Sequence, residues 1–359
     1  MRGLESSSKG LGSTSLRVKL KPHLVIYGGN VARVKMAVIG CGFISTSVHL
    51  PSLTEIPDVE VVAVCDVVEE KARKTAEQFK VEKYYTDYHK VLEMPEVDAV
   101  LIATPPLTHK DQVINAARAG KHVFVEKPIT TNVKDAKEVV DAIKKAGVKC
   151  MVGFCLRFHS MFKHVKELID SGRLGRPVNI WRVCVWPLPP APWLKDKTIS
   201  GGMLVENAVH AFDAFRWFAG DVDTVYAKVM TVQSGITIED NASVVCIHKE
   251  GTISTLIQSW SGTHSWDSWG VVGEKGTVAV EGYLSGVMKI RIADGPYEQL
   301  RMEEDWKLMY KRELEYFIKC IIEDKRPEIN EVEGLRALEI AEAALRSSAE
   351  GRPIKLPLE

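Results

Sequence analysis

The stretch Ala37-Val38-Ile39-Gly40-Cys41-Gly42-Phe43-Ile44-Ser45 decides the fold of this chain. Its apolar start predicts a buried strand, and its two glycines lead into the first turn of a helix. Gly40 permits a tight turn, and Gly42 lets backbone amides approach a pyrophosphate at the helix N-terminus. Ser45 stands where a third glycine is usual, so the match to a dinucleotide-binding turn is imperfect. The residues expected to contact such a cofactor are Gly40, Gly42, Phe43 and Ile44.

Apolar runs and amphipathic segments alternate after this turn. The runs are nearly continuous, as in strands covered on both faces, and we expect strands at 36–40, 59–65, 97–103, 121–125 and 148–153. The segments between them predict helices at 43–54, 69–79, 108–119 and 132–146. This alternation predicts an α/β fold with a doubly wound parallel sheet of the Rossmann type, in a domain that covers 36–154.

Asp66 ends the second expected strand, where an acidic residue accepts hydrogen bonds from the adenosine ribose. Its charge would repel a 2′-phosphate, so the cofactor is expected to be NAD. Lys71 and Arg73 follow closely and could neutralise a phosphate, which leaves NADP possible. The alternative is that the glycines only shape a turn and Asp66 only caps the helix that starts near Glu69.

The pattern changes after about residue 155. A helix at 158–171 is followed by the Pro-rich segment 186–193, which predicts a loop, and by a helix at 203–219. Consecutive β-type runs follow near 222–233, 240–249, 252–261, 266–273, 276–281 and 287–292, and helices are expected at 304–324 and 332–349. The segment 155–359 is therefore expected to form a second, α+β domain with a mostly antiparallel sheet and terminal helices that pack back toward the first domain.

Composition excludes several classes of function. Lys plus Arg and Asp plus Glu both number 47, so no basic surplus indicates nucleic acid or an acidic lipid surface as a partner. No apolar run approaches the roughly 18 residues of a membrane span. The seven cysteines form an odd set without CxxC spacing, which is typical of reduced, buried thiols in the cytoplasm.

The first 35 residues differ from the rest. They are Ser-rich and basic, with Glu5 as the only acid, and Met36 stands just before the first strong strand. A transit peptide has such a composition, but we expect a disordered or non-native leader here.

Two short segments carry side chains that can donate or accept a proton. They are Glu126-Lys127-Pro128 after a strand and Glu206-Asn207-Ala208-Val209-His210 on a helix. Oxidation of a secondary alcohol needs a base for the hydroxyl proton, and histidine titrates near neutral pH. A protonated lysine stabilises the developing alkoxide. Taken alone, Lys127 would be a surface lysine and His210 a core histidine. Glu206 and His210 also have the spacing of metal ligands on a helix, but no third ligand is near, so no metal is expected.

The chain resembles the Gfo/Idh/MocA oxidoreductases, which include glucose-fructose oxidoreductase and inositol 2-dehydrogenase. The resemblance runs from about Met36 to the end, and it rests on the segments 103–109, 120–128, Trp193, 201–206, 210–213 and 239–242. It implies that Lys127 contacts the substrate hydroxyl and that His210 accepts its proton. Glu206 replaces the family's aspartate. The family's second domain has an open sheet, which implies a homodimer or homotetramer formed through that sheet.

The resemblance also implies further site residues. The loop with Thr104, Pro105 and His109 would border the nicotinamide half of the cofactor, with Glu126 and Lys127 beside it. Trp193 and Asn207 are candidates for the substrate pocket. Arg157 either meets a polar substrate or forms an exposed ion pair.

These observations together predict a cytoplasmic NAD(P)-dependent dehydrogenase of a sugar or cyclitol, with catalytic residues Lys127, His210 and Glu206. Two alternatives use the same fold. One is a glycosidase in which bound NAD oxidises the sugar transiently before elimination. The other is a nucleotide-sensing regulator without catalysis.

Overall fold

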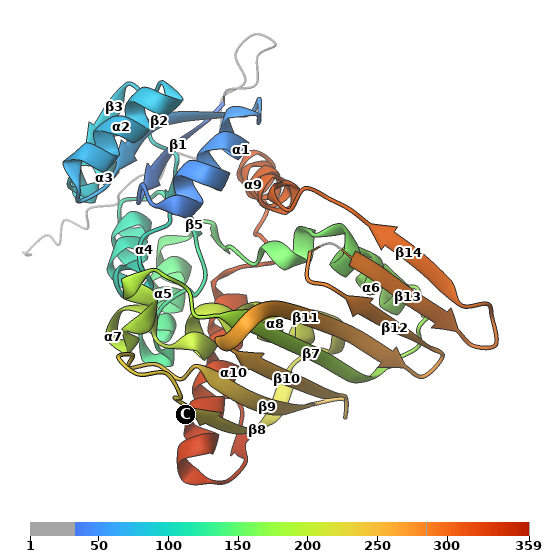
Figure 1. Ribbon diagram of the computed structural model, residues 1–359. Helices are drawn as coiled ribbons and strands as arrows, with labels where there is room; N and C mark the ends of the chain where they lie inside the picture. The colour runs from blue at the N-terminus through green and yellow to red at the C-terminus, as the bar shows by residue number, and fades with distance from the viewer. Residues whose placement is uncertain (1–32, 285, 359) are drawn as a thin grey trace, which may run out of the picture. The chain divides into compact units, whose positions relative to one another are not determined.

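The computed structural model describes residues 33–284 and 286–358 and contains two sheets (Figure 1). The first sheet has six strands in the order β3-β2-β1-β4-β5-β6, and every pair of neighbours is parallel. This is the order of a Rossmann fold, so the predicted fold class is confirmed. The strands are β1 (Val34–Ile39), β2 (Val59–Cys65), β3 (Lys83–Tyr85), β4 (Ala99–Ile102), β5 (His122–Val125) and β6 (Cys150–Val152).

The helices of this half follow the predicted segments closely. They are the π-helical turn η1 (Ser45–His49), α1 (Leu50–Thr54), α2 (Glu69–Phe79), α3 (Tyr88–Leu92), the short η2 (Pro106–Thr108), α4 (His109–Arg118) and α5 (Val133–Ala146). In α5 the Asn132 side chain accepts the N–H of Asp135, and Gly147 ends the helix in the left-handed conformation. The sequence analysis missed β3 and α3, because each is too short to show a period.

The second sheet has nine strands in the order β14-β13-β12-β11-β7-β10-β9-β8-β15, and it is mostly antiparallel as predicted. Among the described residues of this second sheet, the one parallel pair joins β7 to β10. The strands are β7 (Pro177–Pro187), β8 (Val222–Met230), β9 (Asn241–His248), β10 (Ile253–Ser259), β11 (Ser261–Gly273), β12 (Gly276–Glu281), β13 (Gly286–Ile292), β14 (Glu298–Met302) and β15 (Ile354–Lys355).

Strand β7 corrects two expectations from the sequence. No strand was expected at 177–187, and the segment from Trp186 was expected to be a loop, yet β7 lies in the middle of the sheet and continues to Pro187. Arg182 interrupts the apolar pattern of β7. Its charge is balanced 3.1 Å away by Asp267 on the neighbouring β11, which is why a charged residue is buried at this position.

One face of this second sheet is covered by helices. Helix α8 (Val209–Ala219) contacts β7, and α10 (Glu331–Glu350) contacts β8 (Figure 1). The remaining helices of this half are η3 (Cys155–Phe158), α6 (Ser160–Asp170), η4 (Pro192–Lys195), α7 (Lys197–Ser200), the π-helical turn η5 (Leu204–Ala208) and α9 (Lys307–Ile322).

The two long terminal helices also contact the first half. Helix α9 packs against α1 and η1, and α10 packs against α5 and β6. A Cβ atom on Gly334 of α10 would lie 2.9 Å from the Val152 side chain, so glycine permits this close approach. These contacts bring η1, the end of β5 and the start of α8 into one region.

Most of the expected leader, residues 1–32, lies outside the described residues, and β1 begins at Val34, before Met36. In the described part of the chain, no helix combines the length and the apolar character that a membrane span requires.

Candidate functional site

The turn after β1 has the shape that a pyrophosphate needs. Gly40 has a φ of +100°, and a Cβ there would lie 2.6 Å from the Ala103 carbonyl oxygen, so the loops after β1 and β4 meet where only glycine fits. A Cβ on Gly42 would meet no atom within 4 Å. The backbone at Gly42 is therefore open to a ligand.

Asp66 lies beside this turn at the carboxyl end of β2. Its Oδ2 accepts the N–H of Cys41, and its Oδ1 accepts the N–H of Val68, each at 2.9 Å. The carboxylate thus joins the glycine turn to Val68, the residue just before α2, which orients the chain into the helix but is not a cap on the helix itself. It remains partly exposed, and its free lone pairs can still accept ribose hydroxyls.

Exposed apolar side chains mark the same edge of the sheet. Phe43 follows β1, Val67 follows β2 and Leu107 follows β4, with exposed fractions of 74%, 87% and 55%. The sequence analysis missed Val67 and Leu107, although their position directly after a parallel strand was a usable signal. Apolar groups beside an open backbone and a carboxylate suit the flat rings and the ribose of NAD.

The loop after β4 is tied to the loop after β5 by His109. This buried ring lies between two backbone carbonyl oxygens, with Nδ1 2.7 Å from Pro128 and Nε2 2.8 Å from Thr104. Burial lowers the pKa of His109. The contacts of His109 therefore hold the loop in place, whereas Pro105 in the same loop is exposed.

Lys127 and Glu206 form the contact at the centre of the site. Lys127 Nζ donates to Glu206 Oε1 at 2.5 Å and to the Glu206 backbone carbonyl at 2.9 Å. Burial lowers the pKa of Lys127, but the carboxylates of Glu206 and Glu126 outweigh it and leave the pKa raised. The lysine is thus held as an ammonium.

His210 follows η5 at the start of α8 and is 8% exposed. Its Nδ1 is buried and has no hydrogen-bond partner among the described residues. Burial, and then the positive charges of Lys127 and Arg182, hold the pKa of His210 well below its usual value. The imidazole is therefore neutral near pH 7 and free to accept a proton. Glu206 and His210 come from the π-helical turn and from α8, and not from one regular helix as expected.

Glu126 faces the protein interior. Its Oε1 lies 2.7 Å from His49 Nε2, and its Oε2 accepts the N–H of Lys127 at 3.1 Å. Both oxygens are therefore used to fix the loop that carries Lys127.

The structure distinguishes between the two expectations for Arg157. Its guanidinium donates two hydrogen bonds to Asp213, at 2.8 and 2.6 Å, and a third to Glu333 at 2.6 Å. Arg157 and Asp213 are both buried, so the ion pair is not the exposed one that the sequence suggested. The guanidinium is already committed to protein carboxylates.

Two further expected pocket residues are partly exposed. Trp193 lies in η4, and Asn207 lies in η5 next to Glu206, where its Oδ1 accepts a hydrogen bond from Gln258 of β10 at 2.8 Å.

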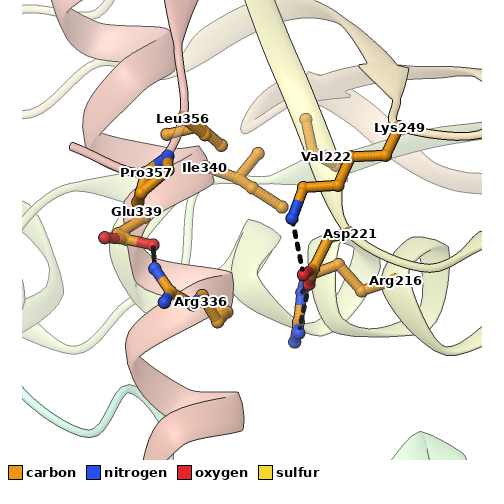
Figure 2. A pocket seen from close by; sticks show the side chains of 9 residues that line it. All are labelled: Arg216, Asp221, Val222, Lys249, Arg336, Glu339, Ile340, Leu356 and Pro357. Atoms are coloured by element: carbon orange, nitrogen blue, oxygen red, sulfur yellow. Dashed lines mark hydrogen bonds and ion pairs between the residues drawn. The ribbon is translucent and has the colours of Figure 1, made fainter.

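A small cavity of about 100 Å³ lies elsewhere, between α8, β8 and α10 (Figure 2). Figure 2 shows Arg216 and Lys249 both directed at Asp221, and Arg336 paired with Glu339. The cavity lining holds three cations and two acids, and each cation is paired with one of these acids. None of the predicted site residues lines it.

Known proteins similar to this chain agree with the fold. The "Oxidoreductase family, NAD-binding Rossmann fold" matches residues 34–154, and the "GFO/IDH/MocA C-terminal domain" matches residues 162–279. Myo-inositol 2-dehydrogenase of Thermotoga maritima is 32% identical over 332 residues, which cover 90% of this chain and 98% of that protein. scyllo-Inositol 2-dehydrogenase (NAD(+)) of Bacillus subtilis is 29% identical over 340 residues, which cover 91% of this chain and 97% of that protein.

Solved structures give the same result. A probable dehydrogenase from Thermotoga maritima has a TM-score of 0.78 at 31% identity, with 89% of this chain and 98% of that chain covered. Levoglucosan dehydrogenase in complex with NADH and L-sorbose has a TM-score of 0.86 and covers 91% of this chain and 100% of its own, but its 20% identity supports the fold alone. On these matches the chain belongs to the Gfo/Idh/MocA family of NAD-dependent oxidoreductases.

Proposed function

We propose that this protein oxidises a secondary alcohol of a sugar or cyclitol, with Lys127 and His210 at the reacting carbon. The observation that supports the proposal most directly is the pair of hydrogen bonds from Lys127, on the loop after β5, to Glu206. Glu206 lies four residues before His210 in the chain. An ammonium and a neutral imidazole are thus held in one region. This region borders the loops at which the family binds NAD.

The charges of the two groups suit opposite tasks. The raised pKa of Lys127 keeps it protonated, so it donates to the substrate oxygen and stabilises the negative charge that develops there. The lowered pKa of His210 keeps the imidazole neutral, which leaves a ring-nitrogen lone pair for the hydroxyl proton, although it also makes the ring a weaker base. Bound NAD supplies the acceptor for the hydride that leaves the same carbon.

Glu206 supports the reaction through Lys127. Its carboxylate accepts a hydrogen bond from the ammonium and fixes where the lysine points. Trp193 and Asn207 are proposed to line the substrate pocket beside it. Polyols are the proposed substrates because the similar proteins above are named inositol dehydrogenases.

The direct test is a screen of polyols, aldoses and inositols with NAD and NADP in parallel. Lys127→Ala and His210→Ala should each lower turnover by about two orders of magnitude or more, while NAD affinity stays near the wild-type value. Normal turnover in both variants would overturn the assignment. Sugar release measured beside the absorbance of reduced nicotinamide separates a dehydrogenase from the glycosidase alternative.

We also propose a homo-oligomer that forms through the face of the second sheet that the helices do not cover. This face carries exposed apolar side chains on the adjacent strands β8, β9 and β10, namely Tyr226, Ile247, Ile253 and Ile257, and Trp266 on β11, which lies beyond β7. Apolar groups this close together favour burial against a second copy. A monomer by light scattering at micromolar concentration would contradict this, and Ile257→Glu should weaken the assembly.

A cytoplasmic location is proposed on the state of the cysteines. All seven are free and buried, as in proteins of reducing compartments.

A further inference from the structure

A second cluster of titratable groups is buried beside the loop that carries Lys127. The proposed reaction does not use this cluster. Its members are His49 on η1, Glu126 after β5 and Glu313 on α9. One side-chain nitrogen or oxygen of each lies within 4.8 Å of the others, and all three side chains are buried. They come from distant parts of the chain, so only the folded protein brings them together.

The two carboxyl groups of this cluster differ in their partners. Glu126 has two, the His49 ring at 2.7 Å and the Lys127 backbone N–H at 3.1 Å. Glu313 is fully buried, and neither of its oxygens has a hydrogen-bond partner within residues 33–284 and 286–358. An ionised carboxylate left in this state would be very costly.

Two carboxyl groups this close in a dry pocket cannot both be ionised unless a cation compensates. His49 Nε2 and Glu126 Oε1 lie 2.7 Å apart, at hydrogen-bond distance, so these two groups satisfy each other without an ion and the geometry favours a proton. Since Glu126 has donors that stabilise its charge and Glu313 has none, the proton belongs on Glu313. Burial, and then the charge of Glu126, raise the pKa of Glu313 well above its ordinary value.

We propose that Glu313 is held as an un-ionised carboxylic acid and is a positioning residue for Lys127, acting through Glu126, whose Oε2 accepts the Lys127 backbone N–H. This role rests on the proposed function, in which Lys127 points toward Glu206 and the substrate oxygen. A charged Glu313 would repel the Glu126 carboxylate and disturb the loop that carries Lys127. The other titratable groups close to Glu313 are Cys155 on η3 and Tyr310 on α9, and burial raises the pKa of both, so they are neutral near pH 7.

The first test measures the unfolding free energy of the full chain against pH, and it needs no substrate. Glutamate in an unfolded chain ionises near pH ~4.3, whereas folded Glu313 keeps its proton to a higher pH. The stability that protonated Glu313 contributes is therefore fully present below the pKa of glutamate in the unfolded chain. It is lost as the pH rises through the pKa of Glu313 in the folded protein. Wild-type stability should fall over this window relative to Glu313→Gln, which has no proton to lose.

If the unfolding free energies of the wild type and Glu313→Gln change with pH in the same way over this range, the proposal is overturned. If the Gln variant does not fold, Glu313→Met provides the same comparison with a neutral side chain of similar volume. Glu315→Gln, at an exposed position on the same helix, is the matched control and should follow the wild type.

A metal ion bound to this cluster, in place of a proton on Glu313, is the rival explanation. Elemental analysis of the purified protein, and thermal melts with added Mg²⁺, Mn²⁺ or Zn²⁺, decide between the proton and the ion. An ion bound at one equivalent and lost in Glu313→Gln would overturn the proposal. The absence of both a bound ion and a melting shift would support it.

The positioning role has its own readout in the pH profile of kcat. Wild-type turnover should decline where Glu313 ionises, and Glu313→Gln should keep its turnover through that pH. Identical profiles would rule out an influence on Lys127. If neither protein turns over any polyol, the proposed function and the positioning role fall together, while the stability curves still decide whether Glu313 holds a proton.

Discussion

Lys127 Nζ lies 2.5 Å from Glu206 Oε1, although the two residues are 79 positions apart in the sequence. The contact joins the loop after β5 to η5, which leads directly into α8 and His210. It gives Glu206 a partner that the sequence did not indicate.

Glu206→Gln should therefore change the pH dependence of turnover as well as its rate. The Glu206 charge raises the pKa of Lys127, so its removal lets the ammonium lose its proton at a lower pH. The alkaline limb of the kcat profile should move to lower pH. Glu206→Asp keeps the charge and should retain more activity, and an unmoved limb in Glu206→Gln would contradict the electrostatic role.

The pKa of His210 should rise when the positive charge of Lys127 is removed. That charge is one of the causes that hold the pKa well below 6.5. In Lys127→Met, the ring should protonate at a higher pH than in the wild type, which NMR titration of the histidine ring signals can measure. Lys110→Met is the control, because Lys110 pairs with Asp135 on α5. No difference between Lys127→Met and the wild type would place the two groups too far apart to interact.

Gly40→Ala and Gly42→Ala should separate folding from cofactor binding. At Gly40 the positive φ and the nearby Ala103 oxygen leave no room for a Cβ, so we expect a loss of about 1–3 kcal/mol in unfolding free energy. At Gly42 the space is open, so the variant should melt near the wild-type temperature but bind NAD more weakly. Normal NAD affinity in a folded Gly42→Ala would argue against a pyrophosphate at this turn.

Asp66→Ser should weaken NAD binding by roughly tenfold or more, because a charged acceptor for the ribose is lost. It should also reduce the preference for NAD over NADP, since the group that repels a 2′-phosphate is gone. KM values for both cofactors check this. The exposed neighbour Glu69 is the control, and Glu69→Ser should leave the preference unchanged.

Arg157→Ala should act on stability. It leaves Asp213 buried without its partner, and the unfolding free energy should fall by about 3–5 kcal/mol. Arg73→Ala, which removes an exposed ion pair on α2, should have little effect. If Arg157→Met folds stably and only the KM for the sugar rises, Arg157 contacts substrate after all.

The Rossmann half was predictable because its signals are local. Strand β2 was predicted at 59–65 and observed at Val59–Cys65, and α2 was predicted at 69–79 and observed at Glu69–Phe79. Parallel strands with both faces covered give unbroken apolar runs, and the helices between them give a clear period. In contrast, β7 was missed because its buried Arg182 is compatible with a strand only when an acid such as Asp267 on the neighbouring β11 pairs with it.

The sequence by itself determined the sheet that binds the cofactor and singled out Lys127, Glu206 and His210 as candidate catalytic residues, because glycine turns, strand ends and short motifs depend on neighbouring residues. Only the tertiary structure decided which side chains contact one another. Lys127 donates to Glu206, Arg157 donates to Asp213, and Glu313 lies beside Glu126. The physical reason is that burial and charge balance depend on side chains that are far apart in the chain and meet only in the folded protein.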